Sequence, residues 1–290
     1  MSMPVETIID EDEILADSGF VWREAGGVKA LISQQLEAAG FQNAFSTRIG
    51  GVSDFPAGSL NLAGFSEDTR ENIYENRRRF LQLFSPGMRI AAVYQCHGST
   101  VESIESEADI TDSDDRADAM VSNLDGVLLG VKTADCVPVL IADPASGAFA
   151  AAHAGWRGTV ASIVVKTVKI MREKFGSEPS KMIAAIGPAA TVRQYEIGED
   201  VLKAFAENFE DSEKYFVPTR PGHARVDLHA ANRDQLLSCG LEAANISIAP
   251  FCTMERTDLF FSYRREKQIN GKTGRLLSVI GRASGRGPIG

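Results

Sequence analysis

Residues 126–158 read GVLLGVKTADCVPVLIADPASGAFAAAHAGWRG and decide the fold. Three apolar runs rich in Val, Leu, Ile and Ala, at 126–132, 137–142 and 147–153, predict buried β-strands separated by short polar or glycine-containing breaks. After Gly158, apolar residues recur at steps of three and four until Gly176, which is typical of a helix closed by a glycine C-cap. Hairpin strands followed by a helix that covers one face favour an α+β fold.

Similar patterns on both sides of this stretch predict further elements. Strands are expected at 41–47, 90–96, 182–187, 246–251, 258–264 and 275–281, and helices at 29–39, 69–83, 199–209 and 228–239. Because strands arrive partly as hairpins and partly separated by helices, we expect layered mixed β-sheets flanked by helices rather than a doubly wound parallel sheet. The sequence has neither a Gly-x-Gly-x-x-Gly fingerprint nor a Walker loop, so nothing local supports nicotinamide or P-loop nucleotide chemistry.

The chain is expected to fold as one domain over residues 18–282. Residues 1–17 form an acidic lead-in with little periodicity, which we interpret as mobile. Residues 283–290 form a glycine-rich tail, which we interpret as flexible. Between them we find no repeat of fixed period and no linker that divides the chain.

Composition and charge exclude several classes of protein. The 290 residues are 44% hydrophobic and 24% charged, which suits a soluble globular chain with a large core. A net charge of −9 and the lack of a strongly basic run argue against a nucleic-acid partner. No apolar run approaches the ~20 residues of a membrane span, and no secretory signal is visible. The four cysteines are sparse and not closely paired, which favours a reducing cytoplasm.

Three residues in glycine-rich or polar contexts form the strongest candidate site. His97 lies in QCHG, Cys136 in TADCVP and His153 in AHAGWRG, each at the end of a predicted strand. Two imidazoles and one thiolate are a known zinc ligand set, and three protein ligands leave a fourth position open, as in catalytic zinc sites. The three residues are far apart in the sequence, so only the fold can bring them together.

The same residues permit a different, metal-free chemistry. Cys136 can be a nucleophile, with His153 or His97 as its base and Asp135 orienting that base, as in cysteine hydrolases and amidases such as those that edit cell-wall precursors. A histidine or cysteine taken alone is also commonly structural. Sequence spacing does not choose among these interpretations, and it does not indicate the oligomeric state.

Arginines beside glycines or apolar strands are candidates for binding an anion. In the segment 45–53, FSTRIGGVS, the Arg48 guanidinium and the backbone amides after it can hold phosphate. Arg157 lies at a predicted helix start, where free amides also favour an anion. The segment 260–265, FFSYRR, places Arg264 after an apolar run. The alternative for Arg48 is a surface salt bridge beside a plain glycine turn.

A series of collinear motifs identifies a family resemblance over most of the chain. The chain resembles the multicopper polyphenol oxidase (laccase-domain) family, whose members are now regarded as zinc-dependent purine nucleoside phosphorylases with adenosine deaminase activity. The motifs are STRIGGVS at 46–53, SLNL at 59–62, QCHG at 95–98, TADCVP at 133–138, HAGWRG at 153–158, GP at 187–188, YEIG at 195–198, DL at 227–228, CT at 252–253 and FSYRR at 261–265.

The resemblance implies a layered α+β architecture, similar to a cysteine-hydrolase-like sandwich, and a metal site made by His97, Cys136 and His153. It implies substrates such as adenosine, inosine, guanosine or methylthioadenosine, together with phosphate. Zinc is the expected metal. Copper is the family's older assignment, but a copper polyphenol oxidase needs several coppers and more histidines than His223 and His229 add. The expected substrate-binding residues are Ser46, Arg48, Gly50, Gly51, Gln95, Arg157 and Arg264.

The expected reaction is phosphorolysis of a purine nucleoside. Phosphate held by Arg48 and backbone amides attacks the ribose anomeric carbon, and the leaving purine is stabilised by protonation or by polar contacts. Zinc with one coordination position open can also activate water for attack at C6 of adenine, which accounts for deamination. Asp135, together with the metal ligands, belongs to the expected catalytic residues, and Asp135 or Glu196 is the candidate proton carrier.

Overall fold

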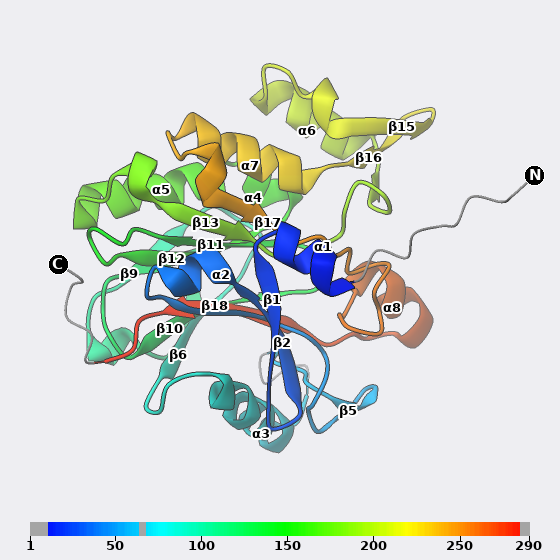
Figure 1. The fold of residues 1–290 in the computed structure, drawn as a ribbon. Coiled ribbons are helices and arrows are strands. Elements are labelled where there is room, and N and C mark those ends of the chain that lie inside the picture. Colours follow the sequence, from blue (N-terminus) through cyan, green and yellow to red (C-terminus); the bar gives the residue numbers. More distant parts are fainter. Residues whose placement is uncertain (1–10, 64–67, 285–290) are drawn as a thin grey trace, which may run out of the picture.

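Two mixed β-sheets lie at the centre of the protein, as the ribbon of the computed structural model shows (Figure 1). The structure describes residues 11–63 and 68–284. The first sheet has the strand order β1–β2–β3–β18–β10–β6–β8, and the second has the order β17–β13–β11–β12–β9–β7. Parallel pairs, such as β10 with β6 and β13 with β17, stand beside antiparallel ones. The expected α+β fold with layered mixed sheets is therefore confirmed.

The strands of both sheets span short segments from all parts of the chain. The first sheet contains β1 (Phe20–Ala25), β2 (Val28–Ser33), β3 (Gln42–Ser46), β6 (Arg89–Tyr94), β8 (Asp112–Arg116), β10 (Val127–Thr133) and β18 (Leu276–Gly281). The second contains β7 (Val101–Ile104), β9 (Ala119–Ser122), β11 (Val137–Ala142), β12 (Phe149–Ala154), β13 (Ile183–Ile186) and β17 (Ile246–Ile248). Two small sheets are formed by β4 (Ser53–Asp54) with β5 (Ala57–Ser59), and by β14 (Glu196–Ile197), β15 (Phe216–Arg220) and β16 (His223–Val226).

Helices cover the outer faces of the two sheets (Figure 1). The helices are α1 (Glu11–Asp17), α2 (Gln34–Ala38), α3 (Arg70–Phe80), α4 (Trp156–Val160), α5 (Ile163–Phe175), α6 (Glu199–Asn208), α7 (Leu228–Ser238) and α8 (Tyr263–Asn270). Helix α3 lies on the first sheet, whereas α4, α5 and α7 lie on the second. Among the described residues, no helix has the length and apolar character needed to cross a membrane.

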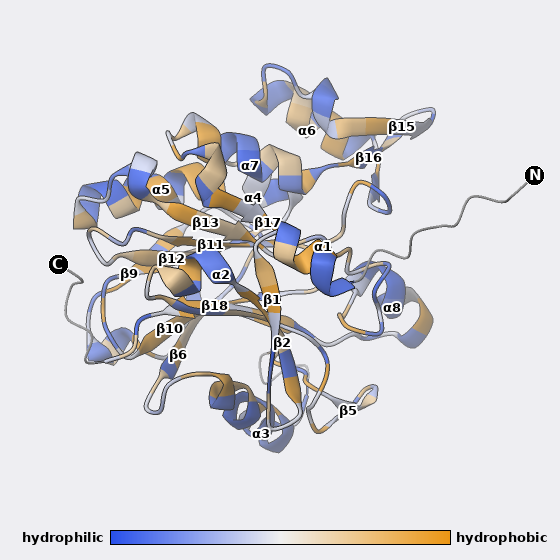
Figure 2. Cartoon of the chain, viewed as in Figure 1, coloured by the Kyte–Doolittle hydropathy of each residue, from blue (hydrophilic) through white to orange (hydrophobic). Residues whose placement is uncertain are grey.

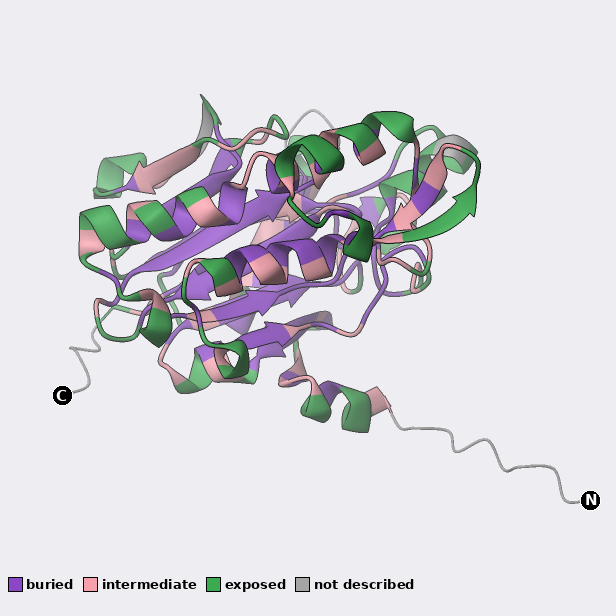
Figure 3. Cartoon of the chain, turned by 90° about the horizontal axis from the view of Figure 1, so that it is seen from above, coloured by how far each residue is buried: buried purple, intermediate pink, exposed green. Residues whose placement is uncertain are grey.

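The core explains why the central strands are apolar on both sides. In β11, Val139 and Ile141 pack outward against the α5 side chains, while Leu140 and Ala142 pack between the two sheets. Every residue of β11 and β12 is buried. Figure 2 shows hydrophobic residues along these strands, and Figure 3 shows the central strands of the protein as buried. Continuous apolar runs are expected where a strand is covered on both faces. The prediction of strands at 137–142 and 147–153 succeeds for this reason.

Most of the predicted elements are confirmed, but two are wrong. The expected helix at 29–39 is β2 followed by the short helix α2, because β2 pairs with β1 and Ser33 then caps α2. The expected strand at 258–264 is a turn followed by α8, whose first turn is capped by the Ser262 side chain. Apolar residues there are buried in the core without a strand partner, so this apolar run reflects burial and not strand pairing.

The end of the expected lead-in is helical and attached to the domain. Residues 11–17 form α1, and Glu11 accepts hydrogen bonds from Trp22 (3.1 Å) and Arg256 (2.6 Å). Residues 1–10, together with 285–290 of the expected flexible tail, lie outside the described residues. The cluster at Glu11 therefore ties the start of the described chain to the loop before α8.

Candidate metal and substrate site

The three residues singled out in the sequence converge in the structure. His97 lies in the loop after β6, Cys136 in the turn between β10 and β11, and His153 in β12. One ligand atom from each residue lies within 4.8 Å of the other two. The pairing of β11 with β12 sets Pro138 opposite His153, which brings the Cys136 turn beside that histidine. A single metal ion can therefore bond two imidazole nitrogens and one thiolate here.

Backbone strain is concentrated at this site. His97 and Asp135 have φ values of 60° and 87°, and Ser162 is the third non-glycine residue with a positive φ among those the structure describes. Left-handed backbone costs of order 1 kcal/mol or more for such residues, so surrounding contacts must hold it. The backbone at Gly155 also packs closely against two of the metal ligands, since a Cβ there would lie 3.1 Å from Cys136 Sγ and 3.2 Å from His97 Cδ2.

Asp118, a residue that sequence reasoning missed, holds both histidines in place. Its carboxylate is completely buried and accepts hydrogen bonds from His153 Nδ1 (2.9 Å) and from the backbone N–H groups of His97 (2.9 Å) and Gly98 (2.6 Å). Because Nδ1 of His153 faces Asp118, its Nε2 is the nitrogen left for a metal. The sequence signal was an acidic residue directly before the apolar strand β9.

The charges around the site favour the Cys136 thiolate and the Asp118 carboxylate. Burial opposes the charged form of His153, but Cys136 and Asp118 outweigh it and raise the pKa of this imidazole to about 9, so a metal that binds His153 displaces a proton. Burial opposes the Cys136 thiolate, but the neighbouring His153 and His97 outweigh it and lower the pKa of this thiol to about 6. Burial also opposes ionisation of Asp118, yet its hydrogen bonds to His153 and Gly98 lower the pKa of the carboxyl to about 2. A thiolate ligand and an anionic carboxylate behind the histidine are the arrangement found around zinc.

Asp135 connects the turn that carries Cys136 to the segment that leads into α8. The side chain is buried and accepts hydrogen bonds from Thr253 Oγ1 (2.7 Å), Ser262 Oγ (3.0 Å) and the Arg264 backbone N–H (2.7 Å). Burial raises the pKa of this carboxyl. The residue expected as a catalytic group thus makes three structural hydrogen bonds next to Cys136.

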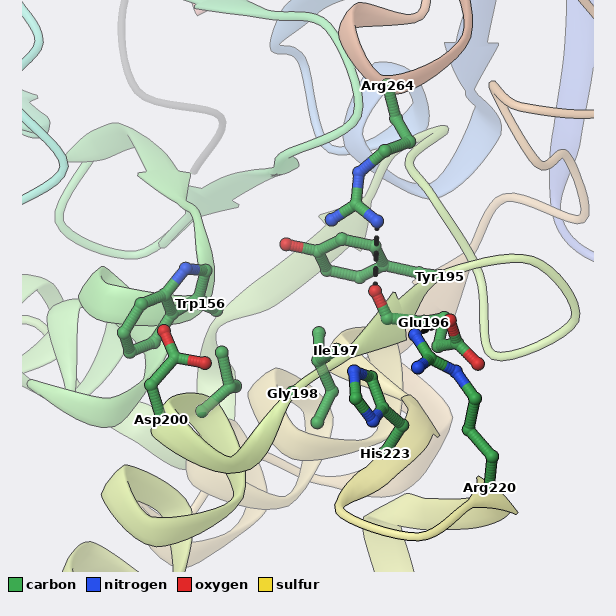
Figure 4. A pocket seen from close by; sticks show the side chains of 10 residues that line it. Trp156, Tyr195, Glu196, Ile197, Gly198, Asp200, Arg220, His223 and Arg264 are labelled. Atoms are coloured by element: carbon green, nitrogen blue, oxygen red, sulfur yellow. Dashed lines mark hydrogen bonds and ion pairs between the residues drawn. The ribbon is translucent and has the colours of Figure 1, made fainter.

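A polar pocket of about 310 Å³ lies among residues that neighbour the metal-ligand loops in the chain, but none of His97, Cys136 and His153 lines it (Figure 4). Two of the lining residues are linked to the metal ligands through the chain. Trp156 lies three residues after His153, and the Arg264 backbone N–H is hydrogen-bonded to Asp135, which directly precedes Cys136. The Arg264 guanidinium lies over the Tyr195 ring at 5.1 Å, and the Arg157 guanidinium over Trp156 at 4.2 Å. The lining residues are Trp156, Tyr195, Glu196, Ile197, Gly198, Asp200, Val201, Arg220, His223 and Arg264.

Two arginines beside this pocket carry charge without an acidic partner. Neither Arg157 nor Arg264 forms an ion pair within the part of the chain that the structure describes, and the Arg264 guanidinium donates only to the Glu196 backbone carbonyl (3.0 Å). Burial, with the nearby Cys136 charge, raises the pKa of Tyr195 to about 12, so its hydroxyl keeps its proton at neutral pH. Two guanidinium groups and a phenol donor are suited to an anionic ligand.

The expected glycine-turn site around Arg48 is built differently. Arg48 is buried, forms an ion pair with Glu266 (2.9 Å) and donates to the Thr257 carbonyl (2.6 Å). Ser46 accepts a hydrogen bond from the Leu277 N–H (2.9 Å). A Cβ on Gly50 would meet Gly27, and a Cβ on Gly51 would meet Ser59, so both glycines allow close packing of backbone segments. None of these residues lines the 310 Å³ pocket.

Two further predicted residues have clear local roles. Gln95 bridges β6 and β10, because its side chain donates to the Lys132 carbonyl and accepts from the Lys132 N–H, both at 2.7 Å. This bridge fixes the start of the His97 loop. Glu196 lines the pocket, and its carboxylate accepts from Thr219 (2.7 Å) and pairs with Arg220 (3.2 Å).

The other two histidines lie outside the metal group. His229 Nε2 donates to the Gly187 carbonyl (3.0 Å), and His223 Nδ1 donates to the Pro221 carbonyl (3.1 Å). His97, Cys136 and His153 are the only candidate metal group among the described residues. The ligands needed for several coppers are therefore not assembled around this site.

Comparison with known proteins places the chain in a family. Residues 42–283 match the model described as multi-copper polyphenol oxidoreductase laccase. The chain belongs to this family. The laccase-like family includes a protein of Deinococcus radiodurans named purine nucleoside phosphorylase, 38% identical over 86% of this chain and 92% of its own length. It also includes purine nucleoside phosphorylase YfiH of Escherichia coli, 34% identical over 87% of this chain and 98% of its own.

A solved structure confirms the laccase-like fold. YlmD from Geobacillus stearothermophilus superimposes with a TM-score of 0.82 at 32% identity, over 92% of this chain and 99% of YlmD. YlmD of the same species is named a purine nucleoside phosphorylase and is 34% identical in sequence over 84% of this chain and 91% of its own. The resemblance read from the motifs is thus confirmed at the level of family and fold.

Proposed function

We propose that the protein is a zinc-dependent purine nucleoside phosphorylase with adenosine deaminase activity. The observation that carries the proposal is the His97–Cys136–His153 group, together with a polar pocket that Arg264 lines and with Arg157, which lies over the pocket residue Trp156. The names of the relatives support phosphorolysis. Adenosine, inosine, guanosine and methylthioadenosine are the proposed nucleosides. The four free cysteines agree with work in a reducing cytoplasm.

The donor set fits zinc better than copper. Two neutral imidazoles and one thiolate are typical of catalytic zinc, and Asp118 behind His153 is the usual carboxylate support for such a ligand. His97, Cys136 and His153 would hold the ion. When bound, zinc supplies Lewis acidity to water or to a phosphate oxygen in its open position.

Arg157 and the pocket residues Arg264 and Tyr195 carry the remaining steps of phosphorolysis. Arg157 and Arg264 bind and orient phosphate, and they replace Arg48, whose charge is already paired with Glu266, as the proposed phosphate ligands. A phosphate oxygen then bonds to the anomeric carbon while the bond from that carbon to the purine nitrogen breaks. The purine takes the bonding electron pair, and the Tyr195 hydroxyl is positioned to donate a hydrogen bond to the leaving group.

Deamination uses the same metal residues with water in place of phosphate, and with the nucleoside turned so that C6 of adenine, rather than the anomeric carbon, faces them. Water adds to C6 of adenine, and ammonia leaves from that carbon after it gains a proton. Glu196 is the proposed proton carrier, because its carboxylate lines the pocket. Asp135 is assigned a positioning role, because all three of its hydrogen bonds hold the loops that carry Cys136 and Arg264.

Metal analysis and product analysis on one sample test the proposal. Purified, untagged protein is analysed for bound elements and then incubated with adenosine, with and without phosphate, while adenine, inosine and ribose 1-phosphate are resolved. We expect about one zinc per chain and phosphate-dependent release of adenine. Inosine formed without phosphate reports deamination. Metal-free protein that forms neither product would refute the assignment.

One observation favours a second candidate function. Cys136, His153 and Asp118 stand in the order nucleophile, base and orienting carboxylate, as in cysteine hydrolases. In that case the Cys136 thiolate bonds to the acyl carbon of an amide, the C–N bond breaks, the amine leaves with a proton from His153, and no metal is needed. A thioester trapped on Cys136 in metal-free protein favours this candidate, whereas joint loss of zinc and phosphorolysis in Cys136→Ala favours the first.

A further inference from the structure

The far end of the pocket carries two acceptor groups that the reaction as described does not use. Asp200 lies in the first turn of α6, and His223 begins β16. Both side chains point into the pocket from the wall opposite Arg264 (Figure 4). Asp200 makes no hydrogen bond or ion pair within residues 11–63 and 68–284. Asp200 is exposed, so its carboxylate is hydrated until a ligand that enters the pocket replaces the water.

Gly198 leaves the space between these two groups open. A Cβ on Gly198 would lie 3.5 Å from Asp200 Oδ1 and 3.8 Å from His223 Nε2, so both atoms border the volume that this residue leaves empty. Gly198 is the N-cap of α6 and has a φ of −104°, which other residues also adopt. Its lack of a side chain is therefore a matter of space rather than of backbone conformation.

Both groups present lone pairs to that space. Nδ1 of His223 donates to the Pro221 carbonyl (3.1 Å), which can only accept, so Nε2 of the neutral ring is an acceptor. The Asp200 carboxylate is an acceptor as well. A ligand edge that enters between them must supply hydrogen-bond donors, because an acceptor placed there would face two lone pairs without compensation.

The arrangement of the pocket sets which part of the ligand reaches this end. Arg264 and the residues beside the metal loops occupy the near end, where phosphate and the anomeric carbon meet if the proposed function holds. A purine attached to that carbon extends away from it, and Trp156 offers an aromatic face along the way. The edge farthest from the ribose, with positions 1, 2 and 6 of the ring, then lies nearest Asp200 and His223.

We propose that Asp200 and His223 read the purine base and select guanine and hypoxanthine over adenine in phosphorolysis. Guanine presents an N1–H and a 2-amino group, one donor for each acceptor, and hypoxanthine presents its N1–H to the carboxylate. Adenine has a donor in its 6-amino group but presents the lone pair of N1 to the carboxylate. This inference rests on the proposed function and deepens it. It also connects the two activities, because deamination of adenosine yields inosine, whose base carries the N1–H that Asp200 accepts.

Substituting Asp200 by asparagine tests the selection directly. The asparagine amide offers both an N–H and an oxygen, which match the N1 and 6-amino group of adenine, so the preference is expected to move towards adenosine. With saturating phosphate, the ratio of kcat/KM for inosine to kcat/KM for adenosine should fall at least about tenfold in Asp200→Asn. His223→Phe should lower the same ratio, and Gly198→Ala should raise KM for all purine nucleosides by filling the space. Glu207→Gln, on the exposed side of α6, is the matched control and should leave the ratio unchanged.

Binding of the free bases gives the same comparison without turnover. Zinc-loaded protein is titrated calorimetrically with hypoxanthine and with adenine, and wild type should bind hypoxanthine more tightly, with the difference lost in Asp200→Asn. Equal binding of both bases by wild type would overturn the selection even if phosphorolysis occurs. An equal loss of activity for every nucleoside in Asp200→Asn would also overturn it, since it would assign Asp200 to the ribose. Absence of phosphorolysis in wild type with base selection intact would instead refute the proposed reaction.

Discussion

The role of Asp118 leads to the most informative single substitution. In Asp118→Asn the side chain keeps its shape but loses its charge and one acceptor oxygen, while His153 Nδ1 and the backbone N–H groups of His97 and Gly98 still need acceptors. The amide also places an N–H against one of these donors. The substitution therefore weakens the positions of two metal ligands at once without removing either of them.

The size of the effect can be worked from the structure. A carboxyl pKa lowered from 3.8 to about 2 corresponds to about 2 kcal/mol of stabilisation by the anionic form. Loss of a carboxylate behind a metal-bound histidine typically weakens metal binding 10–100-fold. We therefore expect Asp118→Asn to lower the zinc affinity by about that factor and to lower the free energy of unfolding of the metal-free protein by about 2 kcal/mol.

Competition with a chromophoric chelator at pH 7 measures the zinc affinity, and urea unfolding of the metal-free protein measures stability. Asp143→Asn is the matched control, because Asp143 is equally buried and accepts from the Ala145 N–H and the Ser146 hydroxyl at the opposite end of the β11–β12 hairpin. It should lower stability without changing zinc affinity. A folded Asp118→Asn variant with wild-type zinc affinity would refute the role assigned to Asp118.

Further predictions concern the surroundings of the site. Gly155→Ala should lower zinc affinity, because its Cβ would lie 3.1 Å from Cys136 Sγ. Chelator competition measures the affinity, and an unchanged value would contradict the steric role assigned to Gly155. Arg264→Gln should raise KM for phosphate more than KM for inosine in steady-state kinetics, and equal changes would speak against a phosphate role. Glu266→Gln should lower the free energy of unfolding by about 3–5 kcal/mol in urea, because it leaves the Arg48 guanidinium buried without its charge partner, and wild-type stability would contradict this. In acid, Asp118 stabilises the metal-free fold above pH 3.8, and this contribution is lost as the pH falls through about 2, so its pH dependence should be absent from Asp118→Asn.

The sequence reveals the parts of the fold that depend on local pattern. Strands covered on both faces, such as β11 and β12, appear as unbroken apolar runs, and α5 appears through its spacing and its glycine cap. Segments decided by distant partners do not appear. β2 has the apolar content of a helix face but pairs with β1, and the apolar residues before α8 are buried without strand partners. Such tertiary contacts override local propensity.

In the candidate site, too, some residues are marked by local sequence pattern and others only by contacts between distant segments. Glycines and polar breaks mark His97, Cys136 and His153. Because these residues are far apart in the sequence, the sequence does not show that they lie close together in space. Asp118 carries no motif, because its importance arises only where β9 lies between β7 and β12 and delivers its carboxylate behind the His97 loop. For Arg48, in contrast, the local motif is visible in the sequence but suggests the wrong partner for its charge. Its glycines are visible in the sequence, but the buried partner Glu266, which occupies its charge, lies more than two hundred residues away.

The formation of ribose 1-phosphate tests the central claim most directly. Protein with its zinc is incubated with inosine and phosphate, and the reaction is followed by phosphorus NMR. The account predicts a growing ribose 1-phosphate signal that matches the release of hypoxanthine and is absent with Cys136→Ala. Zinc-containing protein that releases free ribose, or leaves inosine unchanged, would contradict it.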